Sequence, residues 1–282
     1  MLGVVLILLS TFAYNCSAVL LAMAVRQEPG STSALLSLGR HASGLYGIAS
    51  NLLGWVLEVA ALTMLPLTLA RVLNVSGLVV LLWLTRWLLS ETFGRREILG
   101  AVLIAAGTAA AIFAAPQPGS SHPGIREWVV LLAVLIPCVL LPHAFRLLHR
   151  PVAPVLGATV AGLAYALTGI LTKGAAFTIV SLDLGSLMLF VACIAVIGLI
   201  GFSTEIAALR DGHVAIVVPI VLALHTVLPI FCAPLLFGEV WPASGLLRTF
   251  LGGGIVLATT GSVLLASSAS DYYAAFNFAK QR

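Results

Sequence analysis

Nine long apolar runs, separated by short polar stretches, organise the chain. They cover residues 3–24, 44–64, 67–89, 97–115, 127–147, 152–176, 184–209, 213–237 and 247–267. The breaks between them hold proline, glycine, serine and most of the charges. Because a helix of about 20 apolar residues crosses a hydrocarbon core of about 30 Å, the pattern predicts an all-α polytopic membrane protein with about nine transmembrane helices.

Composition narrows the class further. The 282 residues are 61% hydrophobic and only 9% charged, whereas soluble domains are about one-quarter charged. The net charge is +4, but the 14 Lys and Arg residues stand singly or in pairs, which argues against a nucleic-acid partner. All four cysteines lie inside apolar runs, without a CxxC pair or a histidine at ligand spacing. We therefore expect no disulfide framework, no metal site and no cofactor.

Positive charges predict the orientation in the membrane. With the N-terminus outside, ten Lys and Arg residues fall on the cytoplasmic side and three on the outer side. The cytoplasmic ones are Arg26, Arg40, Arg86, Arg95, Arg96, Arg146, Arg150, Arg210, Lys280 and Arg282; the outer ones are Arg126, Lys173 and Arg248. Cytoplasmic loops carry the excess of positive residues, so we expect a multi-pass plasma-membrane protein with its N-terminus outside and its C-terminus cytoplasmic.

The two halves of the chain share related sequence. The matches, at offsets of 147 to 151, are residues 54–62 (GWVLEVAAL) with 201–209 (GFSTEIAAL), Tyr14 with Tyr165, and Glu91 with Glu239. Within one transmembrane domain, 1–282, they define repeat one (1–115), a connecting helix (127–147), repeat two (152–267) and a short cytoplasmic tail (268–282). Five spans precede the second repeat, so it enters the membrane in the opposite orientation. The chain is therefore predicted to contain two inverted-topology repeats.

Inverted repeats predict a carrier. In such proteins the substrate site lies at the repeat interface near the bilayer midplane, and rocking of one half against the other exposes it alternately to each side. We therefore expect a secondary transporter for a small organic solute or metabolite and not an enzyme. The sequence contains no glycine-rich nucleotide loop, so the energy would come from a gradient, a proton gradient being one candidate, or from exchange.

A motif at the end of each third helix carries a family resemblance. The first copy is Leu88-Leu-Ser-Glu91 and the second is Leu235-Leu-Phe-Gly-Glu239, and each precedes a glycine-rich run. This pattern resembles the drug/metabolite transporter superfamily, in its EamA-like and NIPA-like branches, where the third helix ends in LxxGE and the fourth is rich in glycine. The resemblance implies a fold of that superfamily and transport across the bilayer.

Alternative functions stay open. Nine spans with an outside N-terminus look closer to the NIPA-like branch, which implies a divalent-cation, magnesium-like transporter, although the sequence shows no acidic cluster suited to a hydrated divalent cation. A third possibility is a flippase, or a non-transporting partner subunit, for a lipid-linked envelope intermediate. The substrate is then a small molecule, an ion or a lipid-linked group, and a homodimer or an envelope-protein partner is compatible with each function.

Ionisable residues inside the spans are candidates for the substrate or ion pathway, because a charge at the bilayer centre costs about 2.5–3.5 kcal/mol on insertion scales. Glu58 and Arg71 lie at equal depth on a tight hairpin, so we expect an ion pair. Lys173 belongs to the same end of the bundle and would complete a cluster that binds an anion or gates the mouth. Alternatively, the pair is structural and Lys173 snorkels to the interface.

The second half supplies two further titratable candidates. Glu205 corresponds to Glu58 through the repeat, but no arginine stands at the matching hairpin position. The nearest cations in sequence are Arg210 and His213, so Glu205 either exchanges protons or reaches the cytoplasmic headgroups. His225 lies in mid-span in a helix with three prolines, which favours a cavity-facing position over simple packing.

Uncharged polar residues at mid-depth complete the predicted pathway. Tyr14 and Tyr165 are related by the repeat, so we expect both beside a central cavity. Asn51 and Asn74 either line the pathway or hydrogen-bond between helices.

Small residues predict how the fourth and ninth spans pack. Gly100, Gly107, Gly253 and Gly261 belong to runs of small residues at about four-residue spacing, which lets helices approach closely. We expect these glycines to form a seam between the halves; the alternative is that they face lipid. Glu91 and Glu239 end their helices beside arginines and are interpreted as interfacial anchors.

Overall fold

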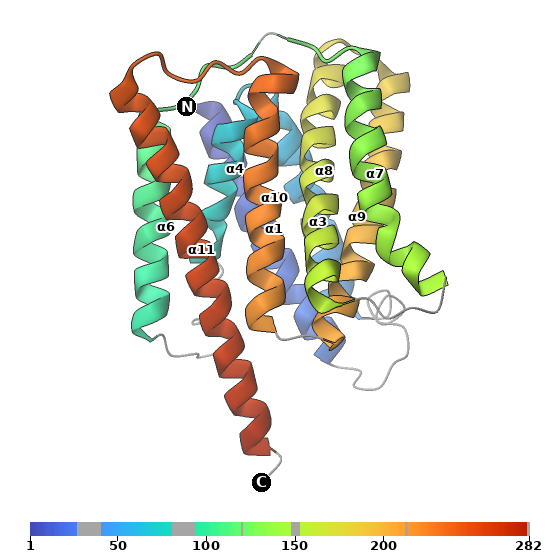
Figure 1. The fold of residues 1–282 in the computed structure, drawn as a ribbon, viewed down its shortest axis with the longest axis vertical. Coiled ribbons are helices and arrows are strands. Elements are labelled where there is room, and N and C mark those ends of the chain that lie inside the picture. Colours follow the sequence, from blue (N-terminus) through green and yellow to red (C-terminus); the bar gives the residue numbers. More distant parts are fainter. Residues whose placement is uncertain (27–40, 81–93, 120, 148–152, 212–213, 281–282) are drawn as a thin grey trace.

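A computed structural model describes residues 1–26, 41–80, 94–119, 121–147, 153–211 and 214–280. Over these residues the chain forms helices and short connections (Figure 1). The helices are α1 (Leu2–Arg26), α3 (Ala42–Leu62), α4 (Leu67–Val75), α6 (Arg95–Phe113), α7 (Ile125–Leu147), α8 (Pro154–Val180), α9 (Leu184–Asp211), α10 (Val214–Phe237) and α11 (Gly245–Lys280). Seven of them, all but α4 and α11, agree with the predicted spans to within four residues at each end.

The helix α4 ends earlier than predicted. The expected span ran from 67 to 89, but α4 stops at Val75, and a short helical stretch resumes over residues 77–80. The hydroxyl of Ser76 bonds to the carbonyl of Leu73 at 2.6 Å, which competes with the regular helical bonding. At Gly77 a Cβ would lie 2.1 Å from the Thr11 methyl group, so only glycine lets this segment approach α1 so closely. The remainder of the predicted span, and Glu91 with it, lies outside the described residues.

The helix α11 runs further than the predicted span. The sequence after residue 267 was expected to be a short tail, whereas α11 continues without interruption to Lys280. Neither proline nor glycine occurs between residues 262 and 280, so the sequence supplies no helix breaker. Figure 1 shows α11 extending past the other helices to the C-terminus, at the end of the bundle opposite the N-terminus.

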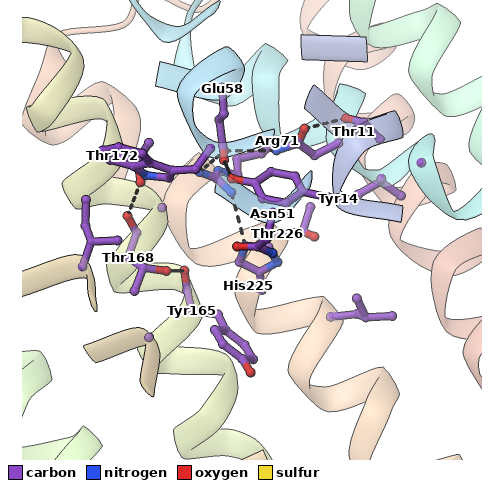
Figure 2. Close-up of a pocket in the computed structure, with 18 of the residues that line it drawn as sticks. Thr11, Tyr14, Asn51, Glu58, Arg71, Tyr165, Thr168, Thr172, His225 and Thr226 are labelled. Carbon is purple, nitrogen blue, oxygen red and sulfur yellow. Dashed lines mark hydrogen bonds and ion pairs between the residues drawn. The ribbon is translucent and has the colours of Figure 1, made fainter. Parts of the chain in front are cut away.

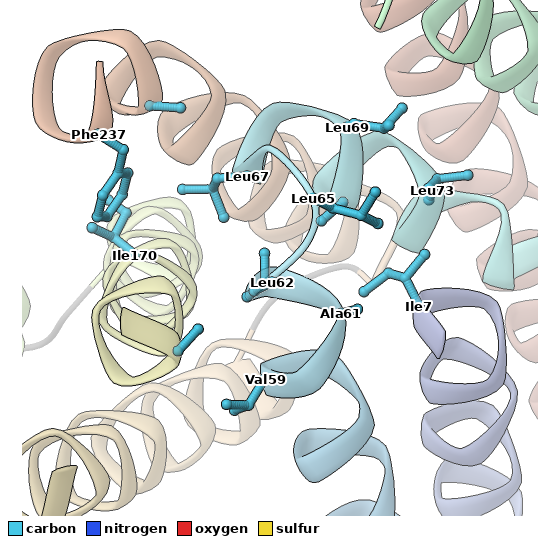
Figure 3. Packing of buried hydrophobic residues seen from close by; sticks show 13 residues of the cluster. Ile7, Val59, Ala61, Leu62, Leu65, Leu67, Leu69, Leu73, Ile170 and Phe237 are labelled. Atoms are coloured by element: carbon cyan, nitrogen blue, oxygen red, sulfur yellow. The ribbon is translucent and has the colours of Figure 1, made fainter. Parts of the chain in front are cut away.

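Two helices, α4 and α8, form the centre of the bundle. Eight of the nine residues of α4 are buried, as are sixteen residues of α8. Around them, α1 packs on α3, α9 and α10 pack on α8, and α6 packs on α11. Leu62, Leu67 and Phe237 belong to an apolar cluster that fills the space around the turn between α3 and α4 (Figure 3). The central position of α4 and α8 explains why their charged residues are removed from solvent.

Within the described ranges, five helices are long and apolar enough to cross a membrane. They cover Ala42–Leu62, Pro154–Val180, Leu184–Glu205, Ile220–Phe237 and Gly245–Leu265. Three shorter apolar helices cover Leu2–Ser17, Leu67–Val80 and Ile98–Phe113.

Candidate functional site

A cavity of about 720 Å³ lies among helices from both halves of the chain (Figure 2). Its walls come from α1, α3 and α4 in the first half and from α8, α9 and α10 in the second, with one residue of α11. Its polar lining consists of Thr11, Tyr14, Asn15, Asn51, Trp55, Glu58, Arg71, Asn74, Tyr165, Thr168, Thr172, His225, Thr226 and Ser262. The prediction that Tyr14, Tyr165 and His225 lie beside a cavity is therefore confirmed.

Glu58 is the centre of a hydrogen-bonded cluster on one wall of the cavity. Its Oε1 accepts a bond from Arg71 Nη2 at 2.9 Å and one from Asn74 Nδ2 at 3.2 Å. The Tyr14 hydroxyl donates to the other carboxylate oxygen, Oε2, at 2.8 Å. Thr11 donates to the Asn74 Oδ1 at 2.9 Å, which fixes the orientation of that amide. The predicted Glu58–Arg71 ion pair is thus confirmed, and both of its side chains are buried.

Arg71 connects the two halves of the molecule across the cavity. Its Nη1 lies 3.2 Å from Nε2 of His225 on α10. Because a guanidinium only donates, Nε2 must carry the lone pair, and the neutral imidazole then bears its proton on Nδ1. The Arg71 Nε–H has no partner among the side chains and backbone groups that the structure describes. Gly169 of α8 makes room for this arrangement, since a Cβ there would lie 2.7 Å from the Arg71 guanidinium.

Glu205 has a tyrosine partner that matches the one at Glu58. The Tyr165 hydroxyl donates to Glu205 Oε2 at 2.7 Å. Each tyrosine ring also packs on a glycine of the neighbouring helix, with Gly54 beside Tyr14 and Gly201 beside Tyr165. Glu205 forms no ion pair with any described side chain; the side chains of the expected cations, Arg210 and His213, lie outside the described part. Among the described residues it is not part of the cavity wall, whereas its partner Tyr165 is.

Lys173 does not join the cluster of Glu58 and Arg71, contrary to prediction. Its Nζ donates to the carbonyl oxygens of Leu62 and Leu65, at 2.7 and 2.8 Å, and its side chain is buried. These carbonyls belong to the C-terminal end of α3 and to the turn after it, where a cation is favoured by the helix dipole. The alternative that Lys173 snorkels to the interface is therefore also wrong.

Glu239 is a buried helix cap and not an interfacial anchor. Its carboxylate accepts bonds from the first two backbone N–H groups of α4, at Leu67 and, at 3.2 Å, at Thr68. Gly238, with φ of +63°, ends α10 and directs the chain inward. Val240, directly after Glu239, exchanges two backbone hydrogen bonds with Gln117, which fixes this segment against the loop after α6. Lys173 and Glu239 together satisfy both helix ends at the turn between α3 and α4, and we call them the turn clamp.

The predicted glycine seam between α6 and α11 is confirmed for three of its four members. Gly100 lies against Gly261, where a Cβ would meet the Gly100 carbonyl at 2.6 Å. Gly107 lies against Gly254, where a Cβ would meet the Gly107 carbonyl at 2.7 Å. Gly253 was the wrong choice: it is exposed, and a Cβ on it would meet nothing within 4 Å. Neighbouring helix positions differ by about 100° in direction, so a shift of one residue points a side chain out of the seam.

Several cavity residues were not singled out from the sequence. Four of them are Trp55, Gly169, Thr172 and Thr226. Thr226 follows His225 directly, so its place beside a predicted polar position was an available signal. No signal in the sequence points to Gly169, because its role depends on an arginine from another helix. Asn51 and Asn74 both line the cavity as expected, and Asn51 is exposed.

Comparison with known proteins yields no relative. No protein-family model matches the chain, and no curated protein or solved structure matches it significantly. In the described ranges, no group of three or more His, Cys, Asp or Glu side chains lies together as a metal site. The apolar helices define the class, an all-helical membrane protein. The polar cavity among them is its candidate functional site.

Proposed function

We propose that the protein is a secondary carrier that moves a small organic solute across the plasma membrane by alternating access. The observation that carries this proposal is the cavity of about 720 Å³, whose walls come from both halves of the chain. A volume of this size suits a small-molecule ligand. A partner subunit without transport activity would be expected to have a packed centre.

An inverted repeat of the type found in the drug/metabolite transporter superfamily would account for the paired contacts. Tyr14–Glu58 and Tyr165–Glu205 join equivalent positions of the two halves at nearly equal distances. The helix pairs that carry them, α1 with α3 and α8 with α9, also pack alike. In Figure 1, α1 descends from the end of the bundle toward which α8 rises. This supports opposite orientations of the two repeats, with an outside N-terminus following from the distribution of positive charges.

Arg71, which reaches across the cavity, links the two halves during alternating access in this proposal. Arg71 stands on α4 of the first half, bonds Glu58 within that half, and reaches His225 in the second half. Rocking of one half against the other would lengthen the contact to His225 and leave the contact to Glu58 intact. Proton coupling through Glu205 or His225 is part of this proposal. Proton coupling would be refuted if an imposed pH gradient did not change the transport rate and Glu205→Gln did not change it either.

Alternating access can be tested without knowing the substrate. A variant free of natural cysteines, with Cys16, Cys138, Cys193 and Cys232 replaced, would receive one cysteine at Thr168, which lines the cavity. We expect a membrane-impermeant thiol reagent to modify Thr168→Cys from either side of the membrane, in right-side-out and in inverted vesicles. Val196→Cys, on an exposed apolar position of α9, is the matched control and should react from neither side. Modification of Thr168→Cys from one side only would contradict the proposal.

The other candidate functions make different predictions for the purified protein. A divalent-cation transporter should gain thermal stability when magnesium is added. A partner subunit for an envelope enzyme should copurify with another protein and should exchange no solute in proteoliposomes. Counterflow with a panel of radiolabelled sugars, amino acids, amines and nucleosides distinguishes these functions from a carrier, which should exchange at least one class faster than protein-free vesicles.

A further inference from the structure

Among the described residues, the exposed part of the cavity wall lies at one place. Of the described residues that line it, the exposed ones are Asn51 and Leu52 on α3 and Ala195 and Phe202 on α9. Leu52 is 59% exposed and Phe202 is 42% exposed, although both face the cavity. Both helices pack on α8, which forms the floor between them. The mouth of the cavity therefore lies between α3 and α9.

This mouth opens at mid-height and not at a helix end. Asn51 and Leu52 are the tenth and eleventh residues of a helix of 21. With a rise of about 1.5 Å per residue, they lie about 15 Å from either end, at the depth of the bilayer midplane. Exposed side chains at this depth face lipid tails in a protein that spans the membrane. A ligand that uses this mouth must therefore partition into the bilayer.

The polar end of the cavity offers hydrogen-bond donors. The Glu58 carboxylate already accepts bonds from three donors, at both of its oxygens. In contrast, the Arg71 Nε–H and the Trp55 indole N–H have no partner among the described residues, and the Arg71 side chain is only 4% exposed. Both nitrogen atoms lie just beneath the cavity surface, so a ligand reaches them when these side chains shift toward it. Buried donors without partners are uncommon in folded proteins. A ligand that supplies acceptors would satisfy them.

Charge balance selects the kind of polar group. Arg71 and Glu58 form an ion pair, so their charges cancel within the cavity wall. An anionic ligand would leave a net negative charge in a site of low dielectric constant, and a cationic one would find the carboxylate already occupied. A neutral acceptor group, such as an amide or a hydroxyl, satisfies the free donors without adding charge.

We propose that the cavity binds an uncharged amphipathic molecule, which enters from the bilayer between α3 and α9. Its acceptor group lies at Arg71 and Trp55, and its apolar chain lies against Leu52 and Phe202. This inference rests on the proposed carrier function, because it names the substrate class of the same cavity.

Photolabelling tests this inference directly. The purified protein in liposomes would be exposed to a long-chain primary amide with a diazirine in its chain, and the labelling that excess unlabelled amide displaces would be measured on α3 and α9. Ala195→Trp narrows the mouth and should reduce this displaceable labelling at least five-fold. Val196→Trp adds the same bulk next to it, at an exposed position that does not line the cavity, and should leave the labelling unchanged.

A second variant tests the polar end. Trp55→Phe removes one unpaired N–H and retains an aromatic ring, so the affinity for the amide should fall about three- to ten-fold. This variant also keeps the inference testable if Ala195→Trp does not fold. Carboxylate and quaternary-ammonium probes of the same chain length should bind more weakly than the amide.

Four outcomes would overturn the inference. They are no displaceable labelling by any probe, equal loss in Ala195→Trp and Val196→Trp, preference for a charged probe, and unchanged amide affinity in Trp55→Phe. Failure of the proposed carrier function would be recognised separately. Thiol access to Thr168→Cys from both sides, together with no amide binding, would retain the carrier and reject the amphipathic substrate. Amide binding, together with thiol access to Thr168→Cys from one side only, would retain the amphipathic ligand and reject the carrier.

Discussion

Replacing Lys173 by methionine tests the role of the turn clamp. The change keeps the length and apolar volume of the side chain but removes the ammonium that donates to the Leu62 and Leu65 carbonyls. Two hydrogen bonds from a charged donor contribute about 1.5–3 kcal/mol each. The variant also avoids the cost of burying an ammonium, which offsets part of this total. We therefore expect a net destabilisation of about 2–3 kcal/mol, with two carbonyls left unsatisfied.

The assay is thermal unfolding of the detergent-purified protein, followed by size-exclusion chromatography. For a chain of this size, 1 kcal/mol corresponds to about 2–4 °C, so the Tm of Lys173→Met should fall by about 5–10 °C. Arg248→Met is the matched control, because Arg248 also donates to a backbone carbonyl, that of Pro242, but is exposed. Its Tm should change by no more than about 2 °C. Equal effects of the two substitutions would show that the buried position of Lys173 contributes nothing.

Further variants test the seam, the cavity wall and the cap. Gly107→Val should destabilise the protein by about 1–3 kcal/mol, because the α6 and α11 backbones would have to separate. Gly253→Val is the control and should be neutral, because its side chain would point outward. Equal melting temperatures of the two variants would refute the seam. Gly169→Ala should displace the guanidinium beside it and slow solute exchange in proteoliposomes, while Gly198→Ala, with its nearest neighbour 3.8 Å away, should not. Burial raises the pKa of Glu239 above its ordinary 4.5, against hydrogen bonds from Thr68 that lower it. The folded state therefore holds this proton more tightly, and its stability should fall as pH rises through the interval between the two values. Melting curves of Glu239→Gln should lack that decline, and a Tm advantage of the native protein that grows with pH would contradict the sign.

The helices, and contacts between residues close in sequence, could be predicted from the sequence. The apolar runs placed seven helices to within four residues, because hydrocarbon thickness sets helix length. The Glu58–Arg71 pair followed from equal depth on one hairpin, and its two residues are only 13 positions apart. The positions of Tyr14 and Tyr165 beside the cavity were predicted from the sequence similarity between the two halves.

Roles that depend on distant backbone could not be predicted. Lys173 binds carbonyls more than 100 residues away, and Glu239 binds N–H groups 171 and 172 residues away. The sequence predicts how deep a side chain lies in the membrane, but not which backbone groups it will bind. The sequence therefore placed Lys173 with Glu58 and Arg71 or at the interface, and Glu239 at the interface, whereas both residues bind the turn between α3 and α4.

The turn clamp also constrains the order in which the protein matures during synthesis. The turn between α3 and α4 is complete only when Lys173 and then Glu239 have been added to the chain. Until the ribosome has passed residue 239, the first hairpin has exposed backbone groups at both helix ends inside or near the bilayer. A fragment that ends after the first half should therefore be degraded when expressed alone, and coexpression with the second half should rescue it. The turn between α3 and α4 is thus synthesised early but is stabilised only after residue 239 has been added.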